Sequence, residues 1–131
     1  MSYEPVLTGG AQSNVYSEHV YRIRATFGAT STLTYRSKDA TIAKTTTTTF
    51  TITLPKAYAE ITAFYVGQKA ATGTDGLDYI ITTNNVATAG TLVLTSISTN
   101  TAGTATAPAS GDVIYITLGV SSDTLNDKFT G

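Results

Sequence analysis

Side chains that carry out acid–base chemistry are scarce in this chain, which has one histidine, His19, and no cysteine. Glu18 directly precedes His19, and neighbouring residues of a strand point to opposite faces, so the two side chains cannot share one proton. Serine and threonine hydroxyls are plentiful, but none lies in a Gly-x-Ser-x-Gly segment and no second histidine could act as base. We therefore expect His19 to be structural or exposed, and the protein not to be an enzyme.

Two carboxylates in the segment GTDGLD, Asp75 and Asp78, are candidate ligands for a hard cation such as calcium. The spacing of an EF-hand loop is missing, and Lys69 ahead of the segment adds a competing positive charge. Aspartate is also common in turns, because its side chain hydrogen-bonds to nearby backbone groups. Turn formation is the preferred interpretation, so we expect neither a metal nor another cofactor.

The charge balance limits the partners that the chain can bind. The net charge is −1 and the pI is about 5.6, so no basic field gathers phosphates, and tryptophan is absent as a stacking platform. No segment reaches the ~18 apolar residues of a membrane span, and the start MSYEPVLTGG lacks the features of a signal peptide. We expect no binding to nucleic acid or membranes, and a protein that is made and kept in a cytoplasm.

The composition and the clearest pattern both indicate strands. The charged fraction is 13%, and roughly a fifth of the residues are threonine, a β-branched polar residue that suits the wet face of a strand. In the segment TTTTTFTITLP, Phe50, Ile52 and Leu54 alternate with threonines until Pro55 ends the strand. We expect the three apolar residues in the core and the threonine face at a sheet edge or against a neighbouring subunit.

Further short strands follow at turn-like spacing. Residues 15–27 alternate in the same way, with a short helix as the alternative, and one or two strands surround a turn at Ser37 to Asp39. The segment EITAFYVGQK is apolar on both faces, which predicts a strand that is central or packed against a partner. Loops are expected around Asn84 and Asn85 and over residues 100–111. Seven or eight strands predict an all-β fold, an antiparallel, jelly-roll-like β-sandwich with extended terminal arms.

The sandwich is expected over residues 15–120 of the 131, the size of one domain. Residues 1–14 are predicted to be either an extended arm that docks on a neighbouring subunit or a disordered terminus, and residues 121–131 a C-terminal tail. The apolar residues of these ends are candidate partner contacts: Tyr3, Val6, Leu7, Leu125 and Phe129.

Arginines and tyrosines suggest further contacts. Arg22 and Arg24 share one face of the first predicted strand, where they form either an ion-pair site across subunits or a solvated edge that discourages aggregation. The solvated edge is the preferred interpretation. The tyrosines are able to stack on sugars, but most fall at apolar positions of the alternation, which favours core and subunit interface.

Four segments of the second half form a recognisable series: FYVGQ, TGTDGLDYII, AGTLVLTS and APASGDVIYITLG. In chain order, the series contains a strand that ends in glycine, a strand that begins with Asp-Tyr and a strand that begins with Gly-Thr. An Ala-Pro-x-x-Gly-Asp turn then leads into a last strand. The residues of this pattern are Val66, Gly67, Asp78, Tyr79, Gly90, Thr91, Ala107, Pro108, Gly111 and Asp112. The pattern resembles a β-module that recurs in tailed-phage structural proteins. Proline, glycine and aspartate each have a structural role in such turns.

The resemblance implies a non-enzymatic virion protein. The short chain with two arms is most similar to a capsid decoration (cement) protein, which implies the major capsid protein as partner and the capsid surface as location. A homotrimer suits the local threefold positions of a capsid. The alternative is a host-recognition or carbohydrate-binding module of a tail or head fibre, acting through the longer loops at residues 70–77 and 100–110. A bacterial adhesin is disfavoured because no signal peptide is present.

Overall fold

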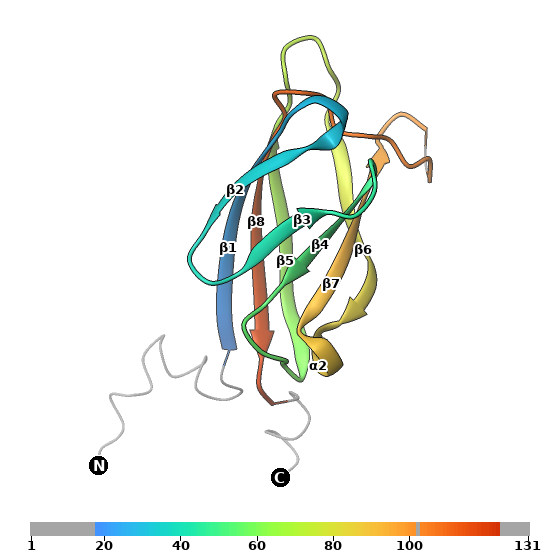
Figure 1. The fold of residues 1–131 in the computed structure, drawn as a ribbon. Coiled ribbons are helices and arrows are strands. Elements are labelled where there is room, and N and C mark those ends of the chain that lie inside the picture. The colour runs from blue at the N-terminus through green and yellow to red at the C-terminus, as the bar shows by residue number, and fades with distance from the viewer. Residues whose placement is uncertain (1–17, 102, 124–131) are drawn as a thin grey trace, which may run out of the picture.

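Two four-stranded antiparallel sheets packed face to face make up the described part of the chain (Figure 1). The structure is a computed structural model and describes residues 18–101 and 103–123. Sheet A has the strand order β2 (Leu33–Ser37), β1 (Glu18–Phe27), β8 (Val113–Ser121) and β5 (Glu60–Lys69). Sheet B has the order β3 (Thr41–Lys44), β4 (Thr49–Thr53), β7 (Thr91–Ser98) and β6 (Leu77–Asn85). The predicted all-β antiparallel sandwich is confirmed.

The connections between strands are of two kinds. Consecutive strands pair within a sheet at β1–β2, β3–β4 and β6–β7, whereas the other connections pass from one sheet to the other. The first and last described strands, β1 and β8, pair along nine register positions from Glu18–Ser121 to Thr26–Val113. Among the described residues, two short helical turns, η2 (Ala29–Ser31) and α2 (Val86–Ala89), lie between strands. Within the described ranges no helix is long and apolar enough to cross a membrane.

The core follows from the alternation. Phe50 and Ile52 are fully buried and Leu54 is nearly so, as the sequence predicts. From sheet A, the inner face of β8 contributes four side chains and the inner face of β1 contributes four more: Ile114, Ile116, Leu118, Val120, Tyr21, Ile23, Ala25 and Phe27. The rings of Phe27 and Phe50 meet across the two sheets at 5.0 Å. In these strands, every second side chain therefore points into the core between the two sheets.

The threonines lie on the outer side of sheet B. Thr45 and Thr51 hydrogen-bond through their hydroxyls at 2.5 Å, and Thr82 and Thr95 do so at 2.8 Å. Because β4 lies between β3 and β7, the predicted sheet edge at this strand is wrong. The contact with a neighbouring subunit at this face stays a prediction.

The strand β5 differs most from expectation. It pairs only with β8 among the described strands, so it is an edge strand and the prediction of a central strand is wrong. A bulge between Ile61 and Ala63 shifts the register, so Phe64 and Val66 pack against the core while Tyr65 is 68% exposed. The single alternation that was predicted over this segment is interrupted, because the bulge adds one unpaired residue.

Two boundaries are also corrected. Asn84 and Asn85 belong to β6, which continues to α2, and not to a loop. The last strand extends through Ser121, one residue into the segment that was predicted as tail. The arm at residues 1–14 lies outside the described residues, as do the contact candidates on it and on the tail: Tyr3, Val6, Leu7, Leu125 and Phe129.

Candidate functional site

The candidate metal ligands are not gathered into a site. Asp75 accepts a hydrogen bond at Oδ2 from Asn100 Nδ2 at 2.8 Å, and this contact joins two loops at one end of the sandwich. Asp78 is exposed on β6. In residues 18–101 and 103–123 no three His, Cys, Asp or Glu side chains are close enough to hold a metal ion. The carboxylate of Asp75 therefore joins two loops, and that of Asp78 is exposed to solvent.

A different carboxylate organises this end of the molecule. Asp112 is 5% exposed, and it accepts hydrogen bonds from Ala71 N at 2.7 Å and from Ala109 N at 3.0 Å. Gly111, just before it, has a φ of +96°, a conformation that favours glycine. The structural roles predicted for glycine and aspartate in the Ala-Pro-x-x-Gly-Asp turn are thus confirmed. Asp112 also ties this turn to the loop that precedes β6.

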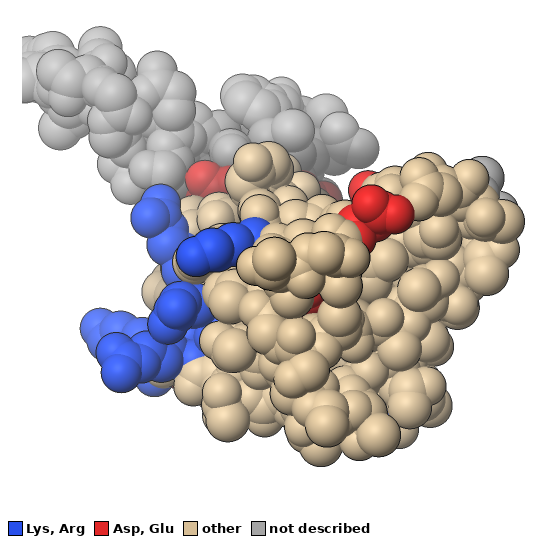
Figure 2. All heavy atoms as spheres, turned by 90° about the horizontal axis from the view of Figure 1, so that it is seen from above, with Lys and Arg blue, Asp and Glu red and all other residues tan. Residues whose placement is uncertain are grey.

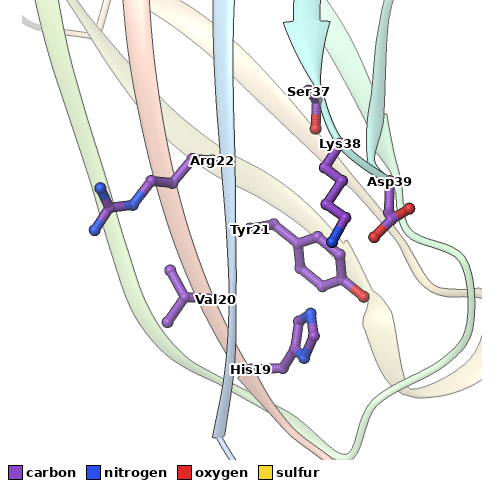
Figure 3. A pocket seen from close by; sticks show the side chains of 7 residues that line it. All are labelled: His19, Val20, Tyr21, Arg22, Ser37, Lys38 and Asp39. Carbon is purple, nitrogen blue, oxygen red and sulfur yellow. The ribbon is translucent and has the colours of Figure 1, made fainter.

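A hollow beside the start of β1 contains the single histidine. It is lined on one side by residues 19–22 of β1 and on the other by the β2–β3 turn, and Figure 3 shows His19 and Tyr21 turned toward Lys38 and Asp39. The His19 ring lies 4.6 Å from the Tyr21 ring. Tyr21 in turn shares a short hydrogen bond with the hydroxyl of Tyr58, and the side chain of His19 is exposed. This agrees with the expectation of a structural or exposed histidine.

The outer face of sheet A carries the most distinctive group of side chains. Arg24 of β1 lies directly opposite Arg36 of β2, and on the other side it lies opposite Tyr115 of β8. Arg22, two residues before Arg24, points to the same face. All three arginines are exposed, and the Arg24 guanidinium lies 6.0 Å from the centre of the Tyr115 ring. We call Arg22, Arg24, Arg36, Tyr65 and Tyr115 the arginine–tyrosine face.

The second tyrosine extends this face across β5. Tyr65 is opposite Thr117, and Gly67 is opposite Tyr115. A Cβ at Gly67 would lie 3.7 Å from the Tyr65 ring, an ordinary van der Waals distance, so the ring lies close to the backbone at Gly67. Tyr65 and Tyr115 are 68% and 44% exposed. A shallow groove of about 340 Å³ runs beside the three arginines and Tyr115.

Positive charge is concentrated here and is not neutralised. Figure 2 shows the visible Lys and Arg side chains gathered along one side of the molecule. Within the described part of the chain, none of the three arginines forms an ion pair. Glu18, further along the same face of β1, is engaged by Thr62, whose Oγ1 donates to Glu18 Oε2 at 2.6 Å. The face is therefore locally cationic on a chain whose net charge is −1.

The local energetics of this face are unfavourable. Like charges directly opposite each other on paired strands are destabilising, by up to roughly 1 kcal/mol. Arg24 and Arg36 form such a pair, and neither has a counter-ion among the described residues. Local conflicts of this kind are expected where a surface is used for binding. The prediction that Arg22 and Arg24 lie on a solvated edge is wrong about the edge, because β1 lies inside sheet A, although both side chains are exposed. The alternative, an ion-pair site across subunits, stays a prediction.

Two of the five residues of this face, Arg22 and Arg24, are contact candidates on the sequence alone. Arg36 is not among those candidates, and the sequence pattern favours core or interface positions for the tyrosines. Of the described tyrosines, Tyr21, Tyr58 and Tyr79 are buried, whereas Tyr35, Tyr65 and Tyr115 are exposed. The two-residue spacing of Arg22 and Arg24 indicates from the sequence that they share one face of a strand. The position of Arg36 on the same face depends on the hairpin register between β1 and β2.

Comparisons of the chain with known protein families, with curated proteins and with solved structures give no match. The function must therefore be inferred from the surfaces described above.

Proposed function

We propose that this protein is a non-enzymatic structural protein of a phage virion, which decorates the capsid and stabilises it by bridging coat subunits. The arginine–tyrosine face is the observation that carries this proposal. Tyrosine and arginine are among the residues enriched at the centres of protein interfaces. Here they are exposed, adjacent and without ion-pair partners among the described residues. The resemblance of the second half to a phage β-module supports the same class.

Bridging requires two contact surfaces, and a sandwich has two outer faces that point in opposite directions. Sheet A offers arginine and tyrosine, whereas sheet B offers threonine hydroxyls such as those of Thr51 and Thr95. Threonine surfaces carry no charge to desolvate and form hydrogen bonds with a second protein, as polar interface rims do. One face would contact one coat subunit while the opposite face contacts a neighbour.

The proposed assembly is a homotrimer on the capsid surface, formed after synthesis in the host cytoplasm. Residues 1–14 are the proposed docking arm, and Leu125 and Phe129 the proposed contacts of the tail. Many small contacts distributed over several subunits would resist expansion of the shell.

Cosedimentation with purified coat shells tests this proposal. We expect saturable binding of the full chain and a raised temperature of shell disruption. A chain that lacks residues 1–14 should bind less tightly while its thermal unfolding stays unchanged. Light scattering coupled to size exclusion measures the oligomeric state, and absence of saturable shell binding would contradict the proposed function.

The exposed pair Tyr65 and Tyr115 also favours a second candidate, a carbohydrate-binding or host-recognition module. Aromatic rings on a flat sheet face can stack on sugars. This alternative predicts glycan binding at that face or at the loops of residues 70–77 and 100–110. A glycan array without hits, together with saturable shell binding, would exclude it.

A further inference from the structure

We propose that the arginine–tyrosine face binds an extended, carboxylate-rich segment of a partner protein. This inference rests on the proposed function in one respect, because the expected source of the segment is a coat subunit. Its chemistry is independent of that source and is tested separately below.

The spacing of the arginines defines the ligand. Arg24 and Arg36 are directly opposite on neighbouring strands, which lie about 4.8 Å apart, and Arg22 and Arg24 are two residues apart along one strand, or about 6.7 Å. A carboxylate between Arg24 and Arg36 is able to accept from both guanidinium groups, and such charge-assisted pairs are short and strong. A second carboxylate at Arg22 would need the spacing that acidic residues at i and i+2 of an extended segment provide.

Bound carboxylates would also remove the conflict within the face. The two opposed guanidinium groups repel each other in the unbound protein, and no described carboxylate neutralises either one. An acidic segment supplies the missing charge, and the chain gains this relief only when the segment is bound. The opposed arginines therefore destabilise the unbound protein and strengthen its binding to an acidic segment.

The surroundings favour a protein segment over a nucleic acid or an acidic polysaccharide. Long polyanions are held by continuous basic grooves, whereas this chain has a net charge of −1 and one compact group of arginines. Val20, which is 46% exposed two residues before Arg22, and Tyr115 flank the arginines with apolar surface. Arginine among apolar and aromatic side chains is the composition of a protein interface.

The first experiment uses a synthetic peptide of alternating glutamate and threonine, with a glutamine–threonine peptide as control. Fluorescence anisotropy with the full chain at low salt measures binding. We expect the glutamate peptide to bind and the glutamine peptide not to bind. The affinity should fall with rising salt, and the double variant Arg24→Gln/Arg36→Gln should weaken it at least about tenfold.

The matched control is Lys44→Gln/Lys56→Gln, which removes the same charge elsewhere. Lys44 donates to Thr30 O at 2.7 Å, and Lys56 lies over the Tyr58 ring, so neither belongs to the arginine–tyrosine face. This variant should bind the glutamate peptide within about twofold of the original chain, since long-range attraction is weak and screened. Thermal unfolding of both variants checks the fold, and the Arg24→Gln/Arg36→Gln protein should unfold at an equal or higher temperature.

Coat shells and competing polyanions complete the test. Equal loss of peptide binding in both double variants would overturn the inference, and so would tight binding of heparin or duplex DNA without binding of the glutamate peptide. Shell binding that is unchanged by Arg24→Gln/Arg36→Gln would overturn the inference but not the proposed function. Arginine-dependent peptide binding without shell binding would support the inference and contradict the proposed function.

Discussion

The side-chain amide of Gln68 pairs with the backbone of Leu77 as a neighbouring strand would. Gln68 Nε2 donates to Leu77 O at 2.5 Å, and Leu77 N donates to Gln68 Oε1 at 2.9 Å. Gln68 lies near the end of β5 in sheet A, and Leu77 begins β6 in sheet B. A side chain at Gly76 would lie 3.2 Å from the amide, so glycine leaves room for the contact. This pair connects the edges of the two sheets.

Replacing Gln68 by leucine should lower the free energy of unfolding by about 1–3 kcal/mol, because two backbone groups of the nearly buried Leu77 lose their partners. Urea unfolding measures the change. The control is Lys69→Leu, the next residue on β5, which is exposed and should change stability by less than about 0.5 kcal/mol. Equal losses in the two variants would show that the amide pair contributes nothing.

Gly90 should be the least replaceable glycine in a left-handed conformation. Its φ is +69°, and a side chain there would meet Lys56 O at 2.5 Å, a backbone atom that cannot move away easily. Gly73 has a φ of +81° with nothing within 4 Å. Gly73→Ala should therefore cost only the backbone strain, about 1 kcal/mol, whereas Gly90→Ala should cost at least about 2 kcal/mol more. Similar thermal shifts for both variants would contradict the close contact.

Asp112 should be required to hold together the two loops that contain Ala71 and Ala109. Asp112→Ala leaves the Ala71 and Ala109 N–H groups without an acceptor, and we expect a loss of about 2–4 kcal/mol. Asp112→Asn keeps one acceptor and should lose less, and the exposed Asp78→Ala should change little. Amide hydrogen exchange provides a local measurement: exchange at Ala71 and Ala109 should accelerate in Asp112→Ala. Unchanged protection there would contradict the assigned role.

Tyr79→Phe should stabilise the protein or leave it unchanged. The Tyr79 hydroxyl is buried and has no hydrogen-bond partner among the described residues, so its removal relieves a desolvated polar group. The expected gain is about 1 kcal/mol. Tyr58→Phe is the opposite case, because Tyr58 is also buried and its hydroxyl shares a hydrogen bond with Tyr21, so this variant should lose stability. Chemical denaturation of both variants at neutral pH distinguishes the two cases.

Stability should decline in alkaline solution. Burial, with a further contribution from the hydrogen bond to Tyr58, raises the pKa of Tyr21, and burial raises the pKa of Tyr79. The folded protein holds these two phenolic protons after the unfolded chain begins to release them near pH 10. The unfolded state then binds fewer protons, so the stabilisation is complete below about pH 10 and decreases as the pH rises further.

Urea midpoints between about pH 8 and pH 11 measure this decline. In Tyr79→Phe the urea midpoint should fall less steeply with pH, because one group with a raised pKa is removed. The matched control is Tyr65→Phe, whose side chain is 68% exposed and whose removal should leave the slope unchanged. The same slope in the original chain and in Tyr79→Phe would show that this phenol does not contribute.

The sequence by itself determined which residues are buried wherever a strand is regular. Alternation is a property of one strand, so Phe50, Ile52 and the inner residues of β1 could be assigned to the core without knowledge of their neighbours. The turn chemistry of Gly111 and Asp112 is equally local, and it was correctly anticipated. The same local signals were sufficient for the all-β class.

Only the tertiary structure decided which strands are neighbours. The opposition of Arg24 and Arg36 depends on the register between the consecutive strands β1 and β2. The edge position of β5 and the exposure of Tyr65 depend on its pairing with β8, which is far away in the chain, and on one bulge. The physical reason is that register and strand order are set by the packing of both sheets together. No single strand's pattern specifies its partner. The arginine–tyrosine face is therefore a product of topology, assembled from four strands whose individual sequences look ordinary.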